Sequence, residues 1–311
     1  MGTRSTIEDF VIGAKLGEGS FGTVWKAIRK VDKKTYAIKQ ISLKNMTKKE
    51  QEDVVQEVKI LARMDSPYII KYYDSFLHNG AVHIVTEYAS KGNLHQYVKA
   101  RRGRALDEEV IWTFLVQTLL GLQHMHGQNI LHRDIKSLNV FLDAKNVIKV
   151  GDLGVAKVLS TQTDFAKTMV GTPYYLSPEL CEDKPYNAKS DLWAFGVMAY
   201  ELCTRKHPFD AENQGALILK IIRGKFPPIQ GYSRELVDFV SRCLTTDAAK
   251  RPDTHCLLAL PSVRGKAEEL KIPLPSAESL GPAAAKYARR ADGPGGGVGR
   301  PLRAVRESSS G

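Results

Sequence analysis

Cysteine is scarce in this sequence, and no two cysteines stand close together. The 311 residues include 4 cysteines, with no Cys-x-x-Cys pair and no spacing typical of a zinc site. We therefore expect neither structural disulfides nor a cysteine-ligated metal, a pattern that favours a protein of the reducing cytoplasm. The cysteines are Cys181, Cys203, Cys243 and Cys256.

Long apolar runs are also missing. No stretch is long enough to cross a bilayer, and the N-terminus lacks the features of a signal peptide, so we expect no transmembrane segment. The opening residues MGTRST match the loose pattern for N-myristoylation at Gly2, a short pattern that often occurs by chance. One acyl chain would give only marginal membrane binding.

Blocks of one charge sign are absent as well, although the net charge is +11. The positive charge is spread along the chain and is not interleaved with aromatic residues, so no specific nucleic-acid binding is predicted. Attraction to acidic surfaces such as microtubules is an open alternative. Hydrophobic residues make up 43% of the chain, enough to bury a substantial core.

What the sequence does contain is a dense group of residues suited to phosphoryl transfer. Residues 132–139 read HRDIKSLN, and the triplet DLG follows at residues 152–154 after a short apolar stretch. Asp134 can accept a proton from a hydroxyl group, while Asn139 and Asp152 can hold magnesium. The pattern resembles the catalytic loop and the metal-binding loop of eukaryotic protein kinases.

A glycine-rich segment precedes this group. Residues 17–22 read GEGSFG, a pattern shared by phosphate-binding loops and dinucleotide sites. A dinucleotide site would need a helix directly afterwards, whereas residues 23–28 read as a strand. The next strand contains YAIK at residues 36–39, and the kinase resemblance makes Lys39 the group that binds the α- and β-phosphates of ATP. The alternative for Lys39 is a solvated surface lysine.

A lysine held near phosphates needs a carboxylate partner. The segment 47–63 predicts a helix, because Thr47 and Glu50 form a capping box and apolar residues recur at helical spacing. Glu57 lies on the apolar face of that helix, where a carboxylate is costly unless it is paired. We interpret Glu57 as the partner of Lys39, the alternative being a solvated glutamate.

Downstream, the chain carries an element found in kinases that act on proteins. Residues 171–179 read GTPYYLSPE and resemble the end of a kinase activation segment, which small-molecule phosphotransferases generally lack. In the family the closing glutamate pairs with an arginine, which implies a buried ion pair of Glu179 with Arg251. Lys136, two residues after the catalytic aspartate, and Thr172 are typical of enzymes that phosphorylate serine or threonine.

Within that class, the sequence is similar to the NIMA-related kinases. The resemblance covers about residues 8–260 and rests on HRDIKS with NVFL in the catalytic loop and on FAKTMVGTPYY at residues 165–175. Leu153 in place of the usual phenylalanine also occurs in that family. The resemblance implies a role in the cell cycle, at the centrosome or in cilia. It also implies a cytoplasmic location, with association at microtubules, the centrosome or the base of the cilium.

The same resemblance implies an α+β fold of two lobes. The N-lobe would be small and mainly antiparallel β with one key helix, and the C-lobe would be larger and mainly α-helical. The C-terminal end is rich in glycine and proline and shows no coiled coil, so it is expected to be flexible. The expected divisions are an N-terminal extension at 1–7, a kinase domain at 8–261 with an N-lobe at 8–88 and a C-lobe at 89–261, and a flexible tail at 262–311.

The cofactors implied are ATP and Mg²⁺. In the family pattern, Val24 and Ala37 cover the adenine ring, Phe141 lies beneath it, and Thr86 stands at the entrance to the rear pocket. Ordinary core packing is the alternative for the apolar members, and both roles are compatible. The whole expected nucleotide site comprises Leu16, Gly17, Gly19, Gly22, Val24, Ala37, Lys39, Thr86, Glu87, Ala89 and Phe141.

Two positions are candidates for regulation. Thr168 aligns with the activating phosphorylation site of NIMA-related kinases, and a phosphate there could pair with Arg133 and Lys157. An unmodified loop threonine is the alternative. Tyr72 falls at a spine position where some members of the family hold a tyrosine that points into the site when inactive, and a tyrosine that is only packed is the alternative.

The substrate groove lacks the carboxylates of kinases that require basic residues. Leu138 is apolar where many kinases carry a polar or acidic residue, and Asn93 stands where such kinases often carry an acid. An arginine two or three residues before the acceptor would find no partner there. We therefore predict protein substrates with a serine or threonine acceptor and an apolar residue at position −3.

A catalytically dead scaffold, or pseudokinase, is the alternative from another functional class. Scaffolds commonly lose at least one catalytic group, whereas Lys39, Glu57, Asp134, Asn139 and Asp152 are all intact. A small-molecule phosphotransferase is a third reading, which the activation segment opposes.

Overall fold

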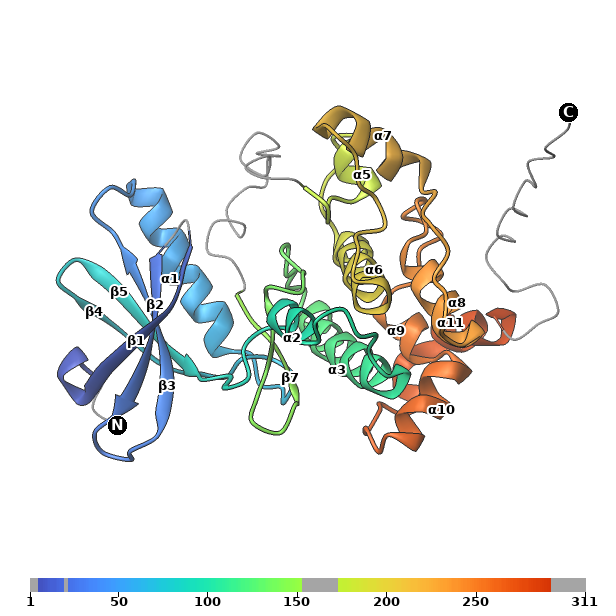
Figure 1. Ribbon diagram of the computed structural model, residues 1–311. Coiled ribbons are helices and arrows are strands. Elements are labelled where there is room, and N and C mark those ends of the chain that lie inside the picture. The colour runs from blue at the N-terminus through green and yellow to red at the C-terminus, as the bar shows by residue number, and fades with distance from the viewer. Residues whose placement is uncertain (1–4, 20–21, 153–172, 292–311) are drawn as a thin grey trace, which may run out of the picture.

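The computed structural model describes residues 5–19, 22–152 and 173–291, and it has the two lobes expected of a protein kinase. A β-sheet with one long helix forms the N-lobe, and a helical bundle forms the C-lobe (Figure 1). Lys157, Thr168 and Thr172 lie outside the described residues, as do Gly2 and Leu153. The predicted fold class is confirmed.

The N-lobe sheet is antiparallel, with strand order β1-β2-β3-β5-β4. Along β3, Tyr36 and Ile38 are buried on one face in a small apolar cluster. Ala37, Lys39 and Ile41 alternate with them and occupy the other face. The strands are β1 (Phe10–Gly19), β2 (Gly22–Arg29), β3 (Thr35–Ser42), β4 (Tyr72–His78) and β5 (Ala81–Glu87), preceded by the short 3-10 helix η1 (Ile7–Asp9).

Helix α1 (Lys48–Ala62) begins where the capping box predicts. The backbone N–H of Glu50 donates to Thr47 Oγ1 at 3.3 Å, and the backbone N–H of Thr47 donates to Glu50 Oε2 at 2.7 Å. Val54 is buried against Ile41 and Ile84, so α1 packs on the face of the sheet that carries Lys39. The side chain of Glu57 lies outside the described residues.

The C-lobe is built around two helices that are buried on most sides, α3 (Glu108–Gly127) and α6 (Ala188–Thr204). Their continuous apolar sequences leave little polar surface, as expected for helices at the centre of a bundle. Among the described residues, no helix combines the length and apolar character needed to cross a membrane. The other elements are α2 (Leu94–Ala100), β6 (Val140–Leu142), β7 (Ile148–Val150), α5 (Pro178–Cys181), α7 (Gln214–Arg223), α8 (Arg234–Cys243) and α9 (Thr254–Leu258).

The prediction of a flexible tail from residue 262 onward is wrong over residues 262–291. The chain there forms α10 (Pro261–Glu269) and α11 (Ala277–Ala291), which pack against the C-lobe. Leu280 and Ala284 of α11 are buried in the main core. A low content of large apolar residues misled the prediction, because small residues are sufficient where a helix lies close to its neighbour.

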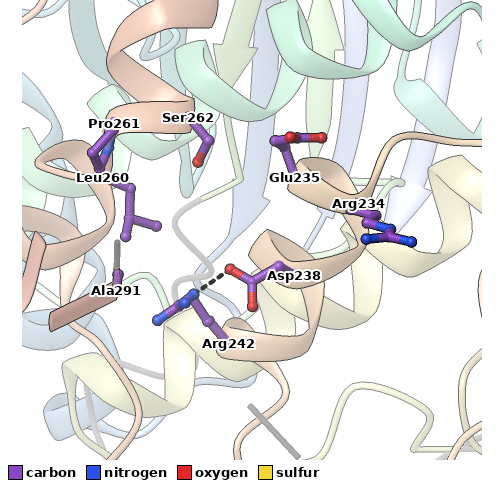
Figure 2. A pocket seen from close by; sticks show the side chains of 8 residues that line it. All are labelled: Arg234, Glu235, Asp238, Arg242, Leu260, Pro261, Ser262 and Ala291. Carbon is purple, nitrogen blue, oxygen red and sulfur yellow. Dashed lines mark hydrogen bonds and ion pairs between the residues drawn. The ribbon is translucent and has the colours of Figure 1, made fainter. Parts of the chain in front are cut away.

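A polar contact fastens the end of α11. Arg242 of α8 donates to the hydroxyl of Tyr287 at 3.2 Å and lies over its ring, and it also pairs with Asp238. The Arg242–Asp238 pair lines a surface cavity of about 220 Å³ together with Leu260 and Ala291 (Figure 2). The helical C-terminal segment is therefore part of the folded lobe.

Candidate active site

The catalytic loop is folded by its own side chains. Asn139 Nδ2 donates to the carboxylate of Asp134 at 2.9 Å and to the Asp134 carbonyl at 2.8 Å. Lys136 Nζ donates to the same carboxylate at 2.9 Å. These bonds bring the three predicted groups together. They also fix the orientation of the Asp134 carboxylate, and a group that accepts a proton from a hydroxyl needs a fixed orientation.

Asp191, at the start of α6, holds this loop in place through hydrogen bonds to its backbone. Its fully buried carboxylate accepts the backbone N–H groups of His132 at 3.0 Å and Arg133 at 2.9 Å. His126 and Tyr186 donate to it as well. Burial raises the pKa of Asp191, but these donors outweigh burial and hold the pKa below its ordinary value.

Sequence reasoning missed this role, although a signal was present. Asp191 is a carboxylate in the first turn of a helix that is buried on most sides, a place where an acid is costly unless several donors satisfy it. The anchored backbone is unusual too, since Arg133 has a positive φ of 67°. We infer that Asp191 stabilises this backbone conformation by accepting hydrogen bonds from the N–H groups of His132 and Arg133.

Two hydrogen bonds connect the catalytic loop to the metal-binding loop. His132 Nε2 donates to the carbonyl of Gly151 at 3.0 Å, and the backbone N–H of Gly151 donates to the carbonyl of Asn139 at 3.0 Å. Burial lowers the pKa of His132, which favours the neutral ring. The bonds fix Asp152, the next residue, relative to Asn139.

Asp152 faces the lysine of β3 across the cleft between the lobes. Lys39 Nζ lies 2.9 Å from Asp152 Oδ1. Partial desolvation in the cleft raises the pKa of Asp152, but the ammonium charge outweighs it and the pKa is lowered overall. The structure therefore brings together Lys39 and Asp152, two groups 113 residues apart, while the predicted contact of Lys39 with Glu57 stays a prediction.

Asn139 and Asp152 are suited to hold a magnesium ion that also binds phosphate oxygens. Among the described hydrogen bonds Asn139 uses only its Nδ2 and backbone, so its Oδ1 is available as a ligand. No cluster of three or more His, Cys, Asp or Glu side chains with metal-binding geometry occurs in the described part of the chain. Magnesium commonly binds through one or two protein groups and completes its shell with substrate phosphates and water, so the residues fit that ion.

Four residues predicted to line the nucleotide site lie together on the N-lobe sheet. Val24 opposes Lys39, and Ala37 opposes Thr86, so these four side chains share one face of the sheet. Phe141 lies between the buried Val140 and Leu142 of β6, and its side chain therefore points the other way, beside Gly151.

Gly22 is held in the tightest position of the glycine-rich segment. A Cβ atom at Gly22 would lie 1.9 Å from the backbone carbonyl oxygen of Gln40, whereas one at Gly17 would meet nothing within 4 Å. The turn pairs Gly19 with Gly22, and the predicted contact residue Leu16 is exposed just before it. Close backbone approach therefore requires glycine at position 22.

Comparisons with known proteins agree with this geometry. The model of the protein kinase domain matches residues 10–262. Serine/threonine-protein kinase Nek1 of Mus musculus is 42% identical over 275 residues, covering 88% of this chain and 23% of Nek1. Nek5 of Homo sapiens is 42% identical over 79% of this chain and 35% of its own length, and Nek4 of Mus musculus is 40% identical over 80% and 32%. This chain belongs to the NIMA-related protein kinases.

The match is confined to one part of those relatives. The chain spans about a quarter to a third of the length of the relatives named above. The protein kinase family in general uses ATP and Mg²⁺, and the site of this NIMA-related kinase has groups that fit both.

The link between the lobes in this NIMA-related kinase is fastened through Glu87. Its carboxylate pairs with Lys149 of β7 at 3.0 Å and accepts the backbone N–H of Lys71 at 3.3 Å. The carbonyl of Ala89 accepts the N–H of Gly92 at 3.3 Å. The segment between the lobes, whose backbone would form hydrogen bonds with adenine, is thus held to both lobes.

Tyr72 packs against the cluster of Ile41, Val54 and Ile84 between the sheet and α1, as does Leu61. A bulge between Tyr72 and Asp74 places Tyr72 opposite Thr86 and Ser75 opposite Ile84, so Tyr72 and Ser75 share one face. The Tyr72 hydroxyl lies 2.8 Å from Ser75 Oγ. In this structure the Tyr72 hydroxyl therefore has a hydrogen-bond partner on its own strand, β4.

The ion pair predicted at the end of the activation segment is confirmed. Arg251 forms hydrogen bonds of 2.9 Å to each carboxylate oxygen of Glu179, and both side chains are buried. At the other end of α6, the hydroxyl of Tyr175 donates to Glu201, which also accepts from Ser137 Oγ at 3.0 Å. These contacts join the segment that receives the substrate to α6 and to the catalytic loop.

Proposed function

We propose that this chain is an active protein kinase that transfers the γ-phosphate of Mg-ATP to serine or threonine in protein substrates. The observation that carries the proposal is the assembled set of Asp134, Lys136 and Asn139, together with the Lys39–Asp152 pair across the cleft. Its membership of a family whose named relatives are serine/threonine-protein kinases supports the acceptor type.

Each group has a defined chemical role. Asp134 orients the substrate hydroxyl and accepts its proton, and Lys136 stabilises the phosphoryl group as it moves. Lys39 binds the non-transferred phosphates. Bound through Asn139 and Asp152, magnesium would neutralise charge on the phosphate oxygens. Since positioning and electrostatics supply most of the catalysis, loss of one group should reduce the rate by orders of magnitude.

The test is phosphate transfer from Mg-ATP to casein by the wild type and by Asp152→Ala. We expect at least about a 100-fold loss of rate in the variant, because it removes a metal ligand. Thermal unfolding of both proteins controls for misfolding. Mass spectrometry of Thr168 in the same samples would show whether the kinase activates itself.

A pseudokinase scaffold is the alternative, and the same assay separates the two. A wild type that binds ATP yet transfers no phosphate, even after Thr168 has been phosphorylated by another kinase, would support the scaffold. The intact catalytic groups oppose that outcome.

We further propose an apolar preference at substrate position −3. Leu138 of the catalytic loop is 47% exposed, so it offers an apolar contact beside the acceptor site. Asn93 caps α2 by accepting the backbone N–H of Gln96 at 2.9 Å and provides no negative charge. A peptide array that shows a strong requirement for arginine at −3 would contradict the proposal.

For the cellular setting we propose the cytoplasm, with association at microtubules, the centrosome or the base of the cilium. The support is the family alone. Microscopy of a tagged full-length protein against centrosome and cilium markers is the direct test, and intact-mass analysis of protein from a eukaryotic host would decide whether Gly2 is myristoylated.

A further inference from the structure

Two segments far apart in the sequence form one positively charged surface on the C-lobe. One is the turn after α2, and the other is the turn after α6. A Cβ atom built on Gly103 would lie 3.8 Å from Arg205 Nη1, so the two turns are in contact. We call this surface the α2–α6 basic cluster, and it consists of Lys99, Arg101, Arg102, Arg104, Arg205 and Lys206.

Few negative charges neutralise the basic side chains of the cluster. None of its members forms an ion pair with a carboxylate in the described part of the chain, and all except Arg101 are exposed. Arg101 is held by Tyr97, donating to its hydroxyl at 2.7 Å and lying over its ring. The nearest acids in the sequence are Asp107, Glu108 and Glu109, which the six basic residues outnumber, and Glu108 already accepts hydrogen bonds from Trp112 and Ser233. Like charges held this close repel one another, and an anionic partner would relieve that repulsion.

The cluster is connected to the acceptor site through the same two helices. In the first turn of α2, the backbone N–H of His95 donates to the carbonyl of Ser137 at 3.0 Å. His95 Nδ1 also lies 3.7 Å from Glu201 of α6, one helical turn before Arg205. The first turn of α2 therefore meets the catalytic loop and its last turn leads into the cluster, while the last turn of α6 contacts His95 and carries Arg205.

Helix geometry gives the distance along this surface. Seven positions separate His95 from Arg102, of which those up to Ala100 lie in α2, and at helical rise this span is about 10 Å. An extended peptide covers that length in roughly three to four residues. A substrate that passes Leu138 and Asn93 at position −3 and continues along α2 would reach the cluster at about position −6 or −7 and would lie along it to about −10.

We propose that the α2–α6 basic cluster is a docking surface for an acidic segment of the protein substrate, on the N-terminal side of the acceptor. This inference rests on the proposed kinase function and adds a substrate class to it. Arginine side chains held at the surface bind carboxylates through paired hydrogen bonds, which favours glutamate and aspartate in that segment.

The test compares two peptides with the same acceptor core, one extended by four glutamates at −7 to −10 and the other by four glutamines. For the wild type we expect kcat/KM to be roughly tenfold higher for the glutamate peptide at low salt, with the advantage falling as salt increases. In R102E/R104E/R205E the advantage should disappear, while the rate on the glutamine peptide stays unchanged.

A matched control separates local docking from net charge. K286E/R289E/R290E makes the same charge change on exposed residues of α11 and should keep the advantage. An equal kcat/KM of the wild type for both peptides, an unchanged advantage in the cluster variant, or an equal loss in the α11 variant would overturn the proposal. A larger advantage when the glutamates follow the acceptor would overturn its placement.

Direct binding distinguishes failure of docking from failure of the kinase function. Fluorescence anisotropy of the labelled glutamate peptide needs no phosphate transfer. Tenfold weaker binding by R102E/R104E/R205E than by wild type would support the docking surface, even if neither peptide were phosphorylated. A lack of phosphorylation would then count against the kinase function alone. Equal binding by both proteins would overturn the docking surface.

Discussion

Arg251 and Glu179 are 72 residues apart in the sequence and form two parallel hydrogen bonds of 2.9 Å inside the C-lobe. The guanidinium also lies over the ring of Trp193, and Ser190 donates to Glu179 at 2.7 Å. Burial raises the pKa of Glu179, but Arg251 outweighs it and the pKa is lowered overall. The end of the activation segment is thereby fixed to α6 and to the turn before α9.

Arg251→Ala should lower the free energy of unfolding by about 3–5 kcal/mol at pH 7, because it leaves the Glu179 charge buried without a partner. The wild-type pair contributes stability above the unfolded pKa of glutamate, about 4.3, and loses it as the pH falls through the lower folded pKa. In the variant burial raises the pKa of Glu179, so the destabilisation should shrink as the pH approaches 4.

The measurement is urea unfolding at pH 7 and at lower pH. Lys250→Ala is the control, since Lys250 forms an exposed pair with Asp247 at 3.2 Å and should cost less than about 1 kcal/mol. Equal costs for the two variants would show that burial of the Arg251 pair has no energetic importance.

Gly22→Ala should destabilise the N-lobe by about 1–3 kcal/mol, because its Cβ atom would overlap the Gln40 carbonyl and force β2 away from β3. Thermal unfolding without nucleotide is the measurement, and ATP affinity should fall as well. Gly17→Ala is the matched control, with free space around the new Cβ atom. A melting temperature unchanged by Gly22→Ala would contradict the predicted overlap.

Tyr72→Ala should raise the basal kinase activity if the tyrosine is an inhibitory switch, as its spine position predicts. The Tyr72–Ser75 contact refines this test. Ser75→Ala removes the partner that holds the hydroxyl on β4, so it should favour the inhibitory position and lower activity. Initial rates of dephosphorylated enzyme measure both effects. A fall in rate for Tyr72→Ala, together with lower stability, would assign Tyr72 to packing alone.

Leu280→Ala should cost about 2–5 kcal/mol of unfolding free energy, because Leu280 anchors α11 in the main core and is 4% exposed. Leu219→Ala on α7 is the control of the same residue type. Leu219 is 54% exposed, so its loss should change stability by no more than about 0.5 kcal/mol. Denaturant unfolding of the full chain compares them, and a negligible effect of Leu280→Ala would mean that α11 is dispensable for the folded lobe.

Short motifs allowed much of the candidate site to be predicted. Asp134, Lys136 and Asn139 lie within eight consecutive residues, so a local loop can bring them together. Asp152 follows after one short hairpin. Because these residues are close in the sequence, few spatial arrangements of their side chains are available, and Lys136 and Asn139 both bond Asp134 as expected.

Support for that site from distant residues was harder to predict. The donors to Asp191 come from outside its own helix, namely from His126, Tyr186 and the catalytic loop. The α2–α6 basic cluster was missed for the same reason, since its two halves are separated by about a hundred residues and the charge looked evenly spread.

The sequence by itself determined the residue chemistry, the kinase resemblance and the helix start at Thr47, because each depends on neighbours within a few positions. Tertiary structure alone decided that Lys39 contacts Asp152, that Asp191 holds the catalytic loop and that α10 and α11 join the core. Such contacts depend on how separate elements pack, and packing is a property of surfaces in space, which local sequence patterns do not encode.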